Sequence, residues 1–319
     1  MLNDNKVKNR IKDGMLLGTI YDQLMLRLRY SDEKTASLYK VMVGQKHRML
    51  FYRKFKKKYL EKCTTQRLWE AKDKVNNKDT VWVMWLQGID NAPEIVKRCV
   101  ESQVQALPEK KFIFLDESSI EKYIKLPEYI YEKRKKGFIG NAHYSDLVRN
   151  EILINYGGYW IDSTVYITDN SLFKNIDDLP LFMFSFYYFG FNPEIMELNN
   201  WLIHSCTNNN MISLLQKMLL EYWKDYDRAV NYFIYQIFET IVNEYYCDEY
   251  KKIPIVSQAP AHLLATYIYD EFDKKKYDFL LQTSGIHKLS TRFDMDKLGE
   301  GSFYNVIVNN MGKESGCIK

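Results

Sequence analysis

The sequence lacks most features of secreted, disulfide-stabilised and membrane-spanning proteins. It contains only five cysteines in 319 residues, and no two of them form a CxxC pair. Scattered cysteines in odd number argue against a disulfide framework and against a structural zinc site. No apolar run approaches the roughly 20 residues needed to cross a bilayer, and the first residues lack the apolar core of a signal peptide. We therefore expect a cytoplasmic protein without a transmembrane segment.

An excess of charge of one sign is also missing. The chain has 45 Lys and Arg against 41 Asp and Glu, a formal net charge of +4. So small an excess does not indicate a general nucleic-acid-binding protein, and no helix-turn-helix, zinc-finger or RNA-binding signature is present. We expect no nucleic-acid partner. Hydrophobic residues make up 46% of the sequence, which is enough for a chain of this length to bury a large core.

Proline and strand patterns are missing from residues 1–78, so we expect this segment to form an N-terminal helical appendage. Within it, residues 48–62 place Tyr52, Phe55 and Tyr59 on one helical face and basic residues around the rest. A basic helix with an aromatic face can bind an anionic membrane surface. The alternative is a helix that packs its aromatic face onto the main domain. The sequence leaves both interpretations open.

The main domain is predicted to cover residues 79–296 and to have an α/β fold. Its first apolar run, residues 81–86, is typical of a central parallel strand. A helix that ends near Ala106 follows, and a second strand at residues 111–115 completes a β-α-β unit. The unit has no GxGxxG motif and no GxxxxGKS or GxxxxGKT motif, so it is neither a dinucleotide fingerprint nor a P-loop.

Later segments extend this pattern and predict a mainly parallel central sheet flanked by helices. Residues 297–319 are polar, contain glycine and are predicted to form a loosely packed C-terminal tail. Between the β-α-β unit and this tail, buried strands are predicted at residues 181–188 and 200–205. Helices that cover the sheet are predicted at residues 211–226, 232–246 and 261–275.

The stretch of residues 143–165 contains the clearest candidate site. Apolar residues at helical spacing predict a helix up to Tyr156. Asp146 and Arg149 are three positions apart and therefore project from one side of this helix. The predicted helix therefore carries a charged pair beside its apolar face.

Two glycines follow the helix, and an acid follows the next strand. Gly157 and Gly158 are expected to end the helix, because the residue past a helix C-terminus commonly takes a left-handed conformation that glycine adopts at little cost. Residues 159–161 are short, aromatic and β-branched, which is typical of a buried strand. Asp162 then stands where that strand ends.

An acid at the end of a strand predicts a ligand or metal site. In open α/β sheets, ligands bind beyond the carboxyl ends of the strands, and two hydroxyl residues follow Asp162. The alternative is that Asp162 caps a turn while Asp146 and Arg149 form a surface ion pair, since structural ion pairs resemble functional ones. The residues by themselves favour neither reading.

Three pieces of the sequence together resemble a known family: residues 82–88 with 91–93, residues 145–164, and residues 287–290. They resemble the capsular polysaccharide synthesis proteins, a branch of the DXD-sugar glycosyltransferases of family 32, and the similarity extends from about residue 80 to about residue 292. The resemblance implies a GT-A architecture, in which a Rossmann-like sheet binds a nucleotide diphospho-sugar. It also implies a divalent cation, Mn²⁺ or Mg²⁺, and sugar transfer with retention of anomeric configuration.

The family's DXD motif falls on Asp162, Ser163 and Thr164. The third position is Thr where many relatives have Asp, and a neutral hydroxyl is a poorer ligand for a hard divalent cation than a carboxylate. The resemblance implies a metal site formed by Asp162, Thr164 and His287. The catalytic residues that it implies are Asp162, Asp146 and Arg149.

The resemblance further implies a set of donor-binding residues. A carboxylate accepts hydrogen bonds from sugar hydroxyls, and a guanidinium group matches phosphate oxygens in bidentate geometry. Lys288 and Arg292 are the candidates for clamping the diphosphate. The whole implied donor-binding set is Trp82, Trp85, Gln87, Gly88, Asp146, Arg149, Asp162, Ser163, Lys288 and Arg292.

The implied function is transfer of a hexose-type sugar to a hydroxyl group of a glycan in capsular or surface polysaccharide synthesis, with a UDP-sugar as the expected donor. An acceptor linked to a lipid would bring the protein to the inner face of the membrane, where residues 48–62 offer a basic surface. Two alternatives stay open. One is a catalytically inactive sugar-nucleotide-binding or membrane-associated assembly protein, and the other is a sugar-phosphate transferase.

Overall fold

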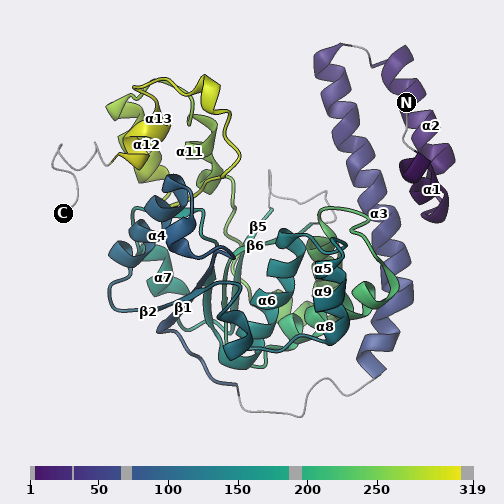
Figure 1. The fold of residues 1–319 in the computed structure, drawn as a ribbon, viewed down its shortest axis with the longest axis horizontal. Helices are drawn as coiled ribbons and strands as arrows, with labels where there is room; N and C mark the ends of the chain where they lie inside the picture. Colours follow the sequence, from purple (N-terminus) through teal and green to yellow (C-terminus); the bar gives the residue numbers. More distant parts are fainter. Residues whose placement is uncertain (1–3, 31, 66–73, 187–195, 310–319) are drawn as a thin grey trace. The chain divides into compact units, whose positions relative to one another are not determined.

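The computed structural model describes residues 4–30, 32–65, 74–186 and 196–309. The chain divides into two compact units, Met1–Lys54 and Phe55–Lys319 (Figure 1). This boundary differs from the predicted one after residue 78. The difference arises because helix α3 (Glu33–Thr65) passes through the boundary, and its last turns belong to the second unit.

The first unit consists of helices joined by short turns in its described residues, as the sequence predicts. It contains α1 (Asp4–Lys12), α2 (Leu16–Leu28) and the beginning of α3. Asp22 on α2 is buried, and its carboxylate accepts hydrogen bonds from the Tyr39 hydroxyl at 3.1 Å and from the Lys46 ammonium at 2.6 Å. These bonds join α2 to α3 within the unit.

The aromatic face of residues 48–62 packs inside the second unit from Phe55 onward. Phe55 and Tyr59 are fully buried, and the Phe55 ring stacks on Phe238 with 5.1 Å between centroids. The Tyr59 hydroxyl donates to the Asp225 carboxylate at 2.8 Å. These contacts favour the packing interpretation for Phe55 and Tyr59, and the membrane-binding interpretation of residues 48–62 stays a prediction.

Three of the basic residues on the same part of α3 are paired as well. Their partners are carboxylates of the second unit, in the pairs Lys56–Glu244, Lys58–Asp225 and Lys62–Glu221. A helix with its rings buried and its ammonium groups paired is a packing element. None of the helices in the described ranges has both the length and the apolar character of a membrane span.

A five-stranded sheet forms the centre of the second unit, in the order β2-β1-β3-β6-β5. The pairs β1–β2 and β1–β3 are parallel, whereas β6 runs antiparallel to both of its neighbours. The predicted mainly parallel sheet is therefore a mixed sheet. The strands are β1 (Thr80–Met84), β2 (Lys111–Leu115), β3 (Gly158–Ile161), β5 (Leu181–Ser185) and β6 (Leu198–Ser205).

Helices cover both faces of this sheet, as predicted. Figure 1 shows α4 and α7 on one face and α6, α8 and α9 on the other. Alternate residues of β1 therefore enter different parts of the core: Val81 and Val83 pack with α4, while Trp82 meets Tyr123 and Tyr156 on the opposite face. The helices are α4 (Glu94–Ala106), α5 (Glu128–Lys135), α6 (Asn141–Tyr156), α7 (Ser171–Ile176), α8 (Asn210–Asp225), α9 (Ile234–Tyr245) and α10 (Cys247–Tyr250).

The C-terminal part differs most from the prediction. Strand β4 (Val165–Ile167) pairs antiparallel with β7 (Ile286–Lys288), and neither strand was expected. In place of one helix over residues 261–275 there are a 3-10 turn (Pro260–His262), α11 (Leu263–Thr266) and α12 (Lys274–Thr283). The predicted loose tail contains α13 (Phe303–Val308), and Phe303 is fully buried in the core. The buried residues of this short helix are Phe303, Tyr304, Val306 and Ile307. The sequence did not predict this packing, because the residues around the helix are polar.

The glycine pair ends α6 as predicted. Close packing against the neighbouring strand also excludes a side chain at Gly158. Gly157 is the C-cap residue with φ 65°, and Gly158 has φ 94°. A Cβ atom on Gly158 would lie 2.6 Å from the carbonyl oxygen of Thr80 on the neighbouring strand. Only a residue without a side chain lets β3 begin this close to β1.

Candidate functional site

A pocket of about 490 Å³ opens where the parallel strands β1 and β3 end. Its position agrees with the rule that ligands of α/β sheets bind beyond the carboxyl ends of the strands. Its volume lies in the range of small-ligand sites. Its walls come from the segment after β1, from the start of α6, from the segment after β3 and from β6, α9 and the segment after β7. The lining residues are Met84, Trp85, Leu86, Gln87, Asn141, Ala142, His143, Ser145, Asp146, Arg149, Trp160, Asp162, Ser163, Thr164, Asn200, Tyr232, Gln236, Thr291 and Arg292.

A buried arginine connects the two carboxylates of this pocket. Arg149 is 5% exposed, and its Nη1 lies 3.2 Å from Oδ1 of Asp146 on the same helix. Its Nη2 lies 3.3 Å from Oδ1 of Asp162, which follows β3. Nη1 also donates to the carbonyl oxygen of Asn200 at 2.8 Å, and Nη2 donates to the Ser145 hydroxyl at 3.0 Å. The predicted pair of α6 and the predicted strand-end acid are thus held together by one guanidinium group.

Asp162 is surrounded by donors. The Trp160 indole donates to its Oδ1 at 3.0 Å, and the Lys288 ammonium donates to its Oδ2 at 3.1 Å. Burial by itself would raise the pKa of Asp162, but the charges of Lys288 and Arg149 and these hydrogen bonds outweigh it and lower the pKa below 3.8. The carboxylate is therefore ionised at neutral pH.

Strand pairing explains why Lys288 reaches this carboxylate. In the β4–β7 ladder, Val165 lies opposite Lys288, and the backbone N–H of Leu289 donates to the carbonyl oxygen of Thr164 at 2.9 Å. This register brings the Lys288 ammonium into hydrogen bonds with both Asp162 and the Thr164 hydroxyl. Lys288 thus bridges the first and third positions of the DXD-like motif.

His287 lies on the opposite side of β7, because successive side chains of a strand alternate. It is 1% exposed, faces Tyr166, and has its Nε2 3.2 Å from the hydroxyl of Thr168. Burial lowers the pKa of His287 to about 4, so the ring is neutral at pH 7. The structure does not bring His287 to Asp162 and Thr164, and the predicted set of three metal ligands is not assembled.

The side chains around Asp162 do not fit a divalent cation. Within the described residues, no group of three or more His, Cys, Asp and Glu side chains is placed to hold a metal. Both oxygens of Asp162 already accept hydrogen bonds from charged or indole donors, and Asp146 is paired with Arg149. A hard cation prefers several oxygen ligands, and here it would have to displace an ammonium group of the same charge sign.

The segment after β1 supplies one aromatic wall of the pocket. Trp85 and Gln87 line it, as does Arg292 from the segment after β7. The indole Nε1 of Trp85 is buried and has no hydrogen-bond partner among the described residues. It is therefore a donor in the pocket wall for which the protein supplies no acceptor.

Three of the predicted donor-binding residues do not line the pocket: Trp82, Gly88, and Lys288, which contacts the lining residues Asp162 and Thr164. Trp82 is 2% exposed, and its ring packs against Tyr123 and Tyr156 on one face of the sheet. Its Nε1 donates to the carbonyl oxygen of Gly157 at 3.0 Å. Gly88 does not line the pocket; it turns the chain with φ 81° beside Asn91. Ser163 lines the pocket and is buried.

Some pocket residues were missed by sequence reasoning. Asn200 is the most connected of them: its Nδ2 donates to Oδ1 of Asp146 at 2.8 Å, and its Oδ1 lies 3.4 Å from Nε2 of Gln236. The one available signal was a pair of asparagines inside an otherwise apolar strand. The other missed lining residues with polar or aromatic side chains are Asn141, His143, Ser145, Trp160, Tyr232, Gln236 and Thr291.

Comparisons with known proteins agree with the resemblance seen in the sequence. Residues 33–307 match the family model described as "Capsular polysaccharide synthesis protein". No curated protein sequence matches the chain. Among solved structures, "PaToxG Glycosyltransferase" aligns over 84% of this chain and 98% of its own, with 11% identity and a TM-score of 0.39. The apo-form glycosyltransferase GlyE of Streptococcus pneumoniae TIGR4 aligns over 75% of this chain and 64% of its own, with 13% identity and a TM-score of 0.38.

Proposed function

This chain belongs to the capsular polysaccharide synthesis family, and we propose that it is a glycosyltransferase that moves a hexose-type sugar from a UDP-sugar to a hydroxyl group of a glycan. The observation that carries the proposal is the charge pattern of the pocket at the ends of β1 and β3. Arg149 and Arg292 line this pocket with two carboxylates, Asp146 and Asp162, and Asp162 also holds Lys288 next to the lining.

The diphosphate of the donor is assigned to the cations. Guanidinium groups bind phosphate oxygens through paired hydrogen bonds, and an ammonium group adds a compact positive charge. Arg149 has a buried Nε atom without a partner among the described residues, and Arg292 is exposed at the pocket wall. The Asp162 carboxylate pairs with both Arg149 and Lys288. We therefore assign to Asp162 the role of positioning these two cations.

The two ends of the donor are assigned to different walls. Trp85 and Gln87 follow β1, and an aromatic ring with a neighbouring amide suits the base and ribose. The sugar is assigned to the side of Asp146 and Asn200. Oδ2 of Asp146 lies 3.6 Å from His143 and can accept a hydrogen bond from a sugar hydroxyl.

The reaction breaks the bond between the anomeric carbon and the diphosphate oxygen and forms a bond from that carbon to the acceptor oxygen. The acceptor proton leaves with the departing diphosphate, which carries away the electron pair of the broken bond. Negative charge develops on that diphosphate, and fixed cations in a pocket stabilise it more than water does. Each 1.36 kcal/mol of such stabilisation is about tenfold in rate.

Retention of configuration is part of the proposal and rests on the family resemblance. Both carboxylates that line the pocket are held in ion pairs, which leaves neither as a free nucleophile for a covalent intermediate. Attack of the acceptor on the same face as the leaving diphosphate is the route that fits. Analysis of the product anomer by NMR tests this, and an inverted product would contradict it.

A thermal-shift screen of nucleotide-sugars, followed by a nucleoside diphosphate release assay, tests the proposed function. A ligand that binds the folded chain stabilises it by RT ln(1 + [L]/Kd), so the screen ranks donors directly. We expect the largest shift with a UDP-sugar and slow release of UDP from it. Binding without release would instead favour the sugar-nucleotide-binding protein, for which Thr164 in place of a carboxylate is the supporting observation. No shift with any nucleotide or nucleotide-sugar would contradict both.

A further inference from the structure

We propose that the Lys288 ammonium stands in the position of the divalent cation, so that this site binds the donor diphosphate without a metal. The inference rests on the proposed function, because it concerns the same donor. Its starting point is the bridge from Lys288 to Asp162 and Thr164, the residues that the family motif would offer to a metal.

The motif change and the lysine match each other chemically. A carboxylate at the third motif position would supply a second anionic ligand, whereas Thr164 supplies a neutral hydroxyl oxygen. An ammonium group is satisfied by one carboxylate and one hydroxyl, because it donates three hydrogen bonds and carries one charge. Asp162 and Thr164 give it these two acceptors, and its third N–H is left for a phosphate oxygen.

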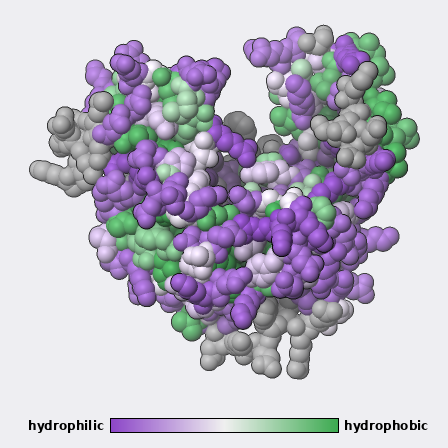
Figure 2. Space-filling view, viewed as in Figure 1, coloured by the Kyte–Doolittle hydropathy of each residue, from purple (hydrophilic) through white to green (hydrophobic). Residues whose placement is uncertain are grey.

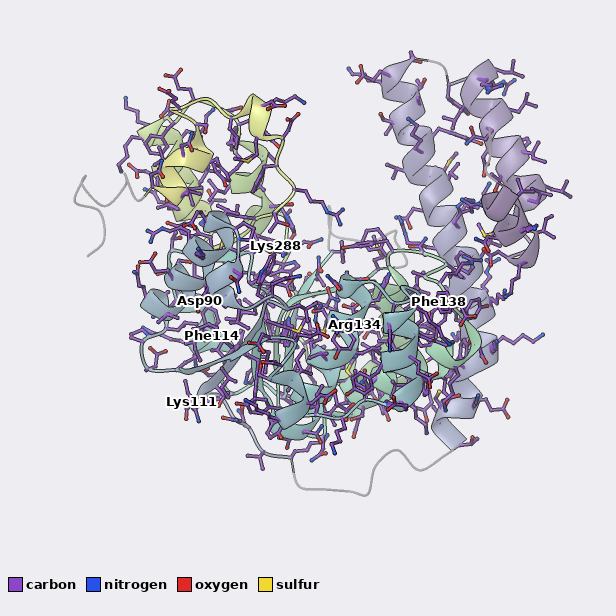
Figure 3. All side chains as sticks on the ribbon, in the orientation of Figure 1. Asp90, Lys111, Phe114, Arg134, Phe138 and Lys288 are labelled. Carbon is purple, nitrogen blue, oxygen red and sulfur yellow. The ribbon has the colours of Figure 1, made fainter. Side chains whose placement is uncertain are left out.

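The position of Lys288 is fixed by the fold. The antiparallel pairing of β4 with β7 sets its register, and the hydrogen bond from Leu289 to Thr164 continues that pairing. The Lys288 side chain is 18% exposed, so it is largely buried but not closed off, and its ammonium group is bonded to two lining residues, Asp162 and Thr164. Figure 3 shows Lys288 at the upper end of the sheet, apart from Arg134 on α5.

The charge of the pocket agrees with this role. Its lining residues include two carboxylates, Asp146 and Asp162, and two arginines, Arg149 and Arg292. Lys288 adds a third cation that is bonded to the lining. A bound diphosphate thus meets three cations and two carboxylates, a net positive charge that the protein itself provides.

Calorimetric titration of the full chain with UDP, in EDTA and in Mn²⁺, tests the proposal. Wild-type affinity is expected to agree within about twofold between the two conditions, because no bond to the diphosphate depends on a metal. Lys288→Ala is expected to weaken UDP binding in EDTA by about tenfold or more, the range for a lost charged hydrogen bond. Lys288→Arg keeps the charge and is expected to retain part of the affinity.

Lys297→Ala is the matched control, because Lys297 is exposed and pairs with Asp294 outside the pocket lining. Circular dichroism and the melting temperature verify that each variant folds. The proposal is overturned if wild-type binding disappears in EDTA and returns with Mn²⁺, or if Lys288→Ala binds UDP as the wild type does. Absence of UDP and UDP-sugar binding under both conditions would instead overturn the proposed function, so the two failures are distinguishable.

A separate observation concerns the first unit, Met1–Lys54. Exposed apolar side chains gather there along one face of α2: Leu17, Ile20, Tyr21, Leu24 and Leu28. Their spacing of three, four and seven residues places them in one stripe. Figure 2 shows hydrophobic side chains over α2. We call this set the α2 stripe.

The unit that carries the α2 stripe has a net positive charge. Residues 1–54 contain twelve Lys and Arg against five Asp and Glu, so this unit carries more net charge than the whole chain, for which the counts are 45 and 41. A helix with an apolar face and basic surroundings binds the interface of an anionic membrane. We infer that the α2 stripe lies on an anionic lipid surface. A second copy of this chain is a poorer occupant, because two units of the same strong charge repel each other.

Flotation of the full chain with vesicles tests this inference. The protein is expected to float with phosphatidylcholine vesicles that contain phosphatidylglycerol, to float less with phosphatidylcholine alone, and to be released by high salt. The double variant Leu24→Gln/Leu28→Gln is expected to lose most of the floated fraction. The control Ile255→Gln/Phe279→Gln removes two side chains of similar exposure from the second unit and is expected to float as the wild type does.

Two results would overturn the inference. One is wild-type protein that does not float with anionic vesicles, and the other is a Leu24→Gln/Leu28→Gln variant that floats normally. A dimer in solution that this double variant abolishes, without any flotation of the wild type, would assign the α2 stripe to a second copy.

Discussion

The Arg149 guanidinium lies 3.3 Å from the Asp162 carboxylate, although the two residues belong to different elements, the helix α6 and the segment after β3. Gly157 and Gly158 make this contact possible, because the chain reverses at these two residues and returns along the sheet. One continuous stretch of sequence thus supplies both the donor and the acceptor of the ion pair at the base of the pocket.

Arg149→Lys is expected to reduce kcat/KM for the donor at least about a hundredfold, because a lysine cannot keep the contacts to Asp146, Asn200 and Asp162 together. Steady-state assays with the preferred donor measure this. Arg134→Lys is the matched control, since Arg134 pairs with Glu117 on the surface and does not line the pocket. Equal loss of activity in both variants would remove the special role of Arg149.

Asn200→Ala is expected to lower kcat/KM by about tenfold, because Asp146 loses its 2.8 Å hydrogen bond from the asparagine amide. The backbone carbonyl that accepts from Arg149 remains in the variant. Asn199→Ala is the control, since the neighbouring side chain donates to Gln258 and accepts from the backbone N–H of Asn200, and Asp146 is not among these partners. Unchanged kinetics for Asn200→Ala would show that Asp146 does not depend on this partner.

Gly158→Ala is expected to destabilise the protein by about 2 kcal/mol or more, because the new Cβ atom would lie 2.6 Å from the carbonyl oxygen of Thr80. Gly137→Ala separates conformational strain from this clash. Gly137 also has a positive φ, of 75°, but its Cβ would meet open space, so a cost of about 1 kcal/mol is expected. Urea unfolding of both variants provides the comparison, and equal losses would contradict the clash.

His204 is expected to make stability depend on pH. Burial lowers the pKa of His204 to about 4, from the ordinary pKa of 6.5 for an exposed ring. Between these values the unfolded chain binds a proton that the folded chain does not, so stability falls as pH is lowered from 6.5 toward 4. Replacement by leucine removes this titration. The slope of unfolding free energy against pH should then drop by up to about 1.4 kcal/mol per pH unit. Parallel slopes for the wild type and His204→Leu would contradict a buried neutral ring.

Local patterns in the sequence predicted the central elements well. The helix up to Tyr156, the glycine stop, the strand β3 and the strand-end Asp162 depend on periodicity and on glycine conformation within one short stretch. The direction of β6 was not predictable in the same way. Its apolar run packs between two layers of helices, and such a run has the same pattern whether it is parallel or antiparallel to its neighbours.

Long-range pairing explains what the sequence did not reveal about the site. Strands β4 and β7 are three residues each and lie more than a hundred positions apart, so neither shows a strand pattern of its own. Their register decides that Lys288, and not His287, faces Asp162. The same applies to Asn200, whose contact with Asp146 depends on the pairing of β3 with β6.

The proposed reaction cleaves the bond between a sugar and a nucleoside diphosphate in this pocket. Phosphorus NMR of the wild-type chain incubated with the donor ranked first by thermal shift tests it most directly, with Asp162→Asn alongside. The two phosphate resonances of a free nucleoside diphosphate are expected with the wild type and not with the variant. Formation of a nucleoside monophosphate, or a donor that stays intact with the wild type, would contradict it.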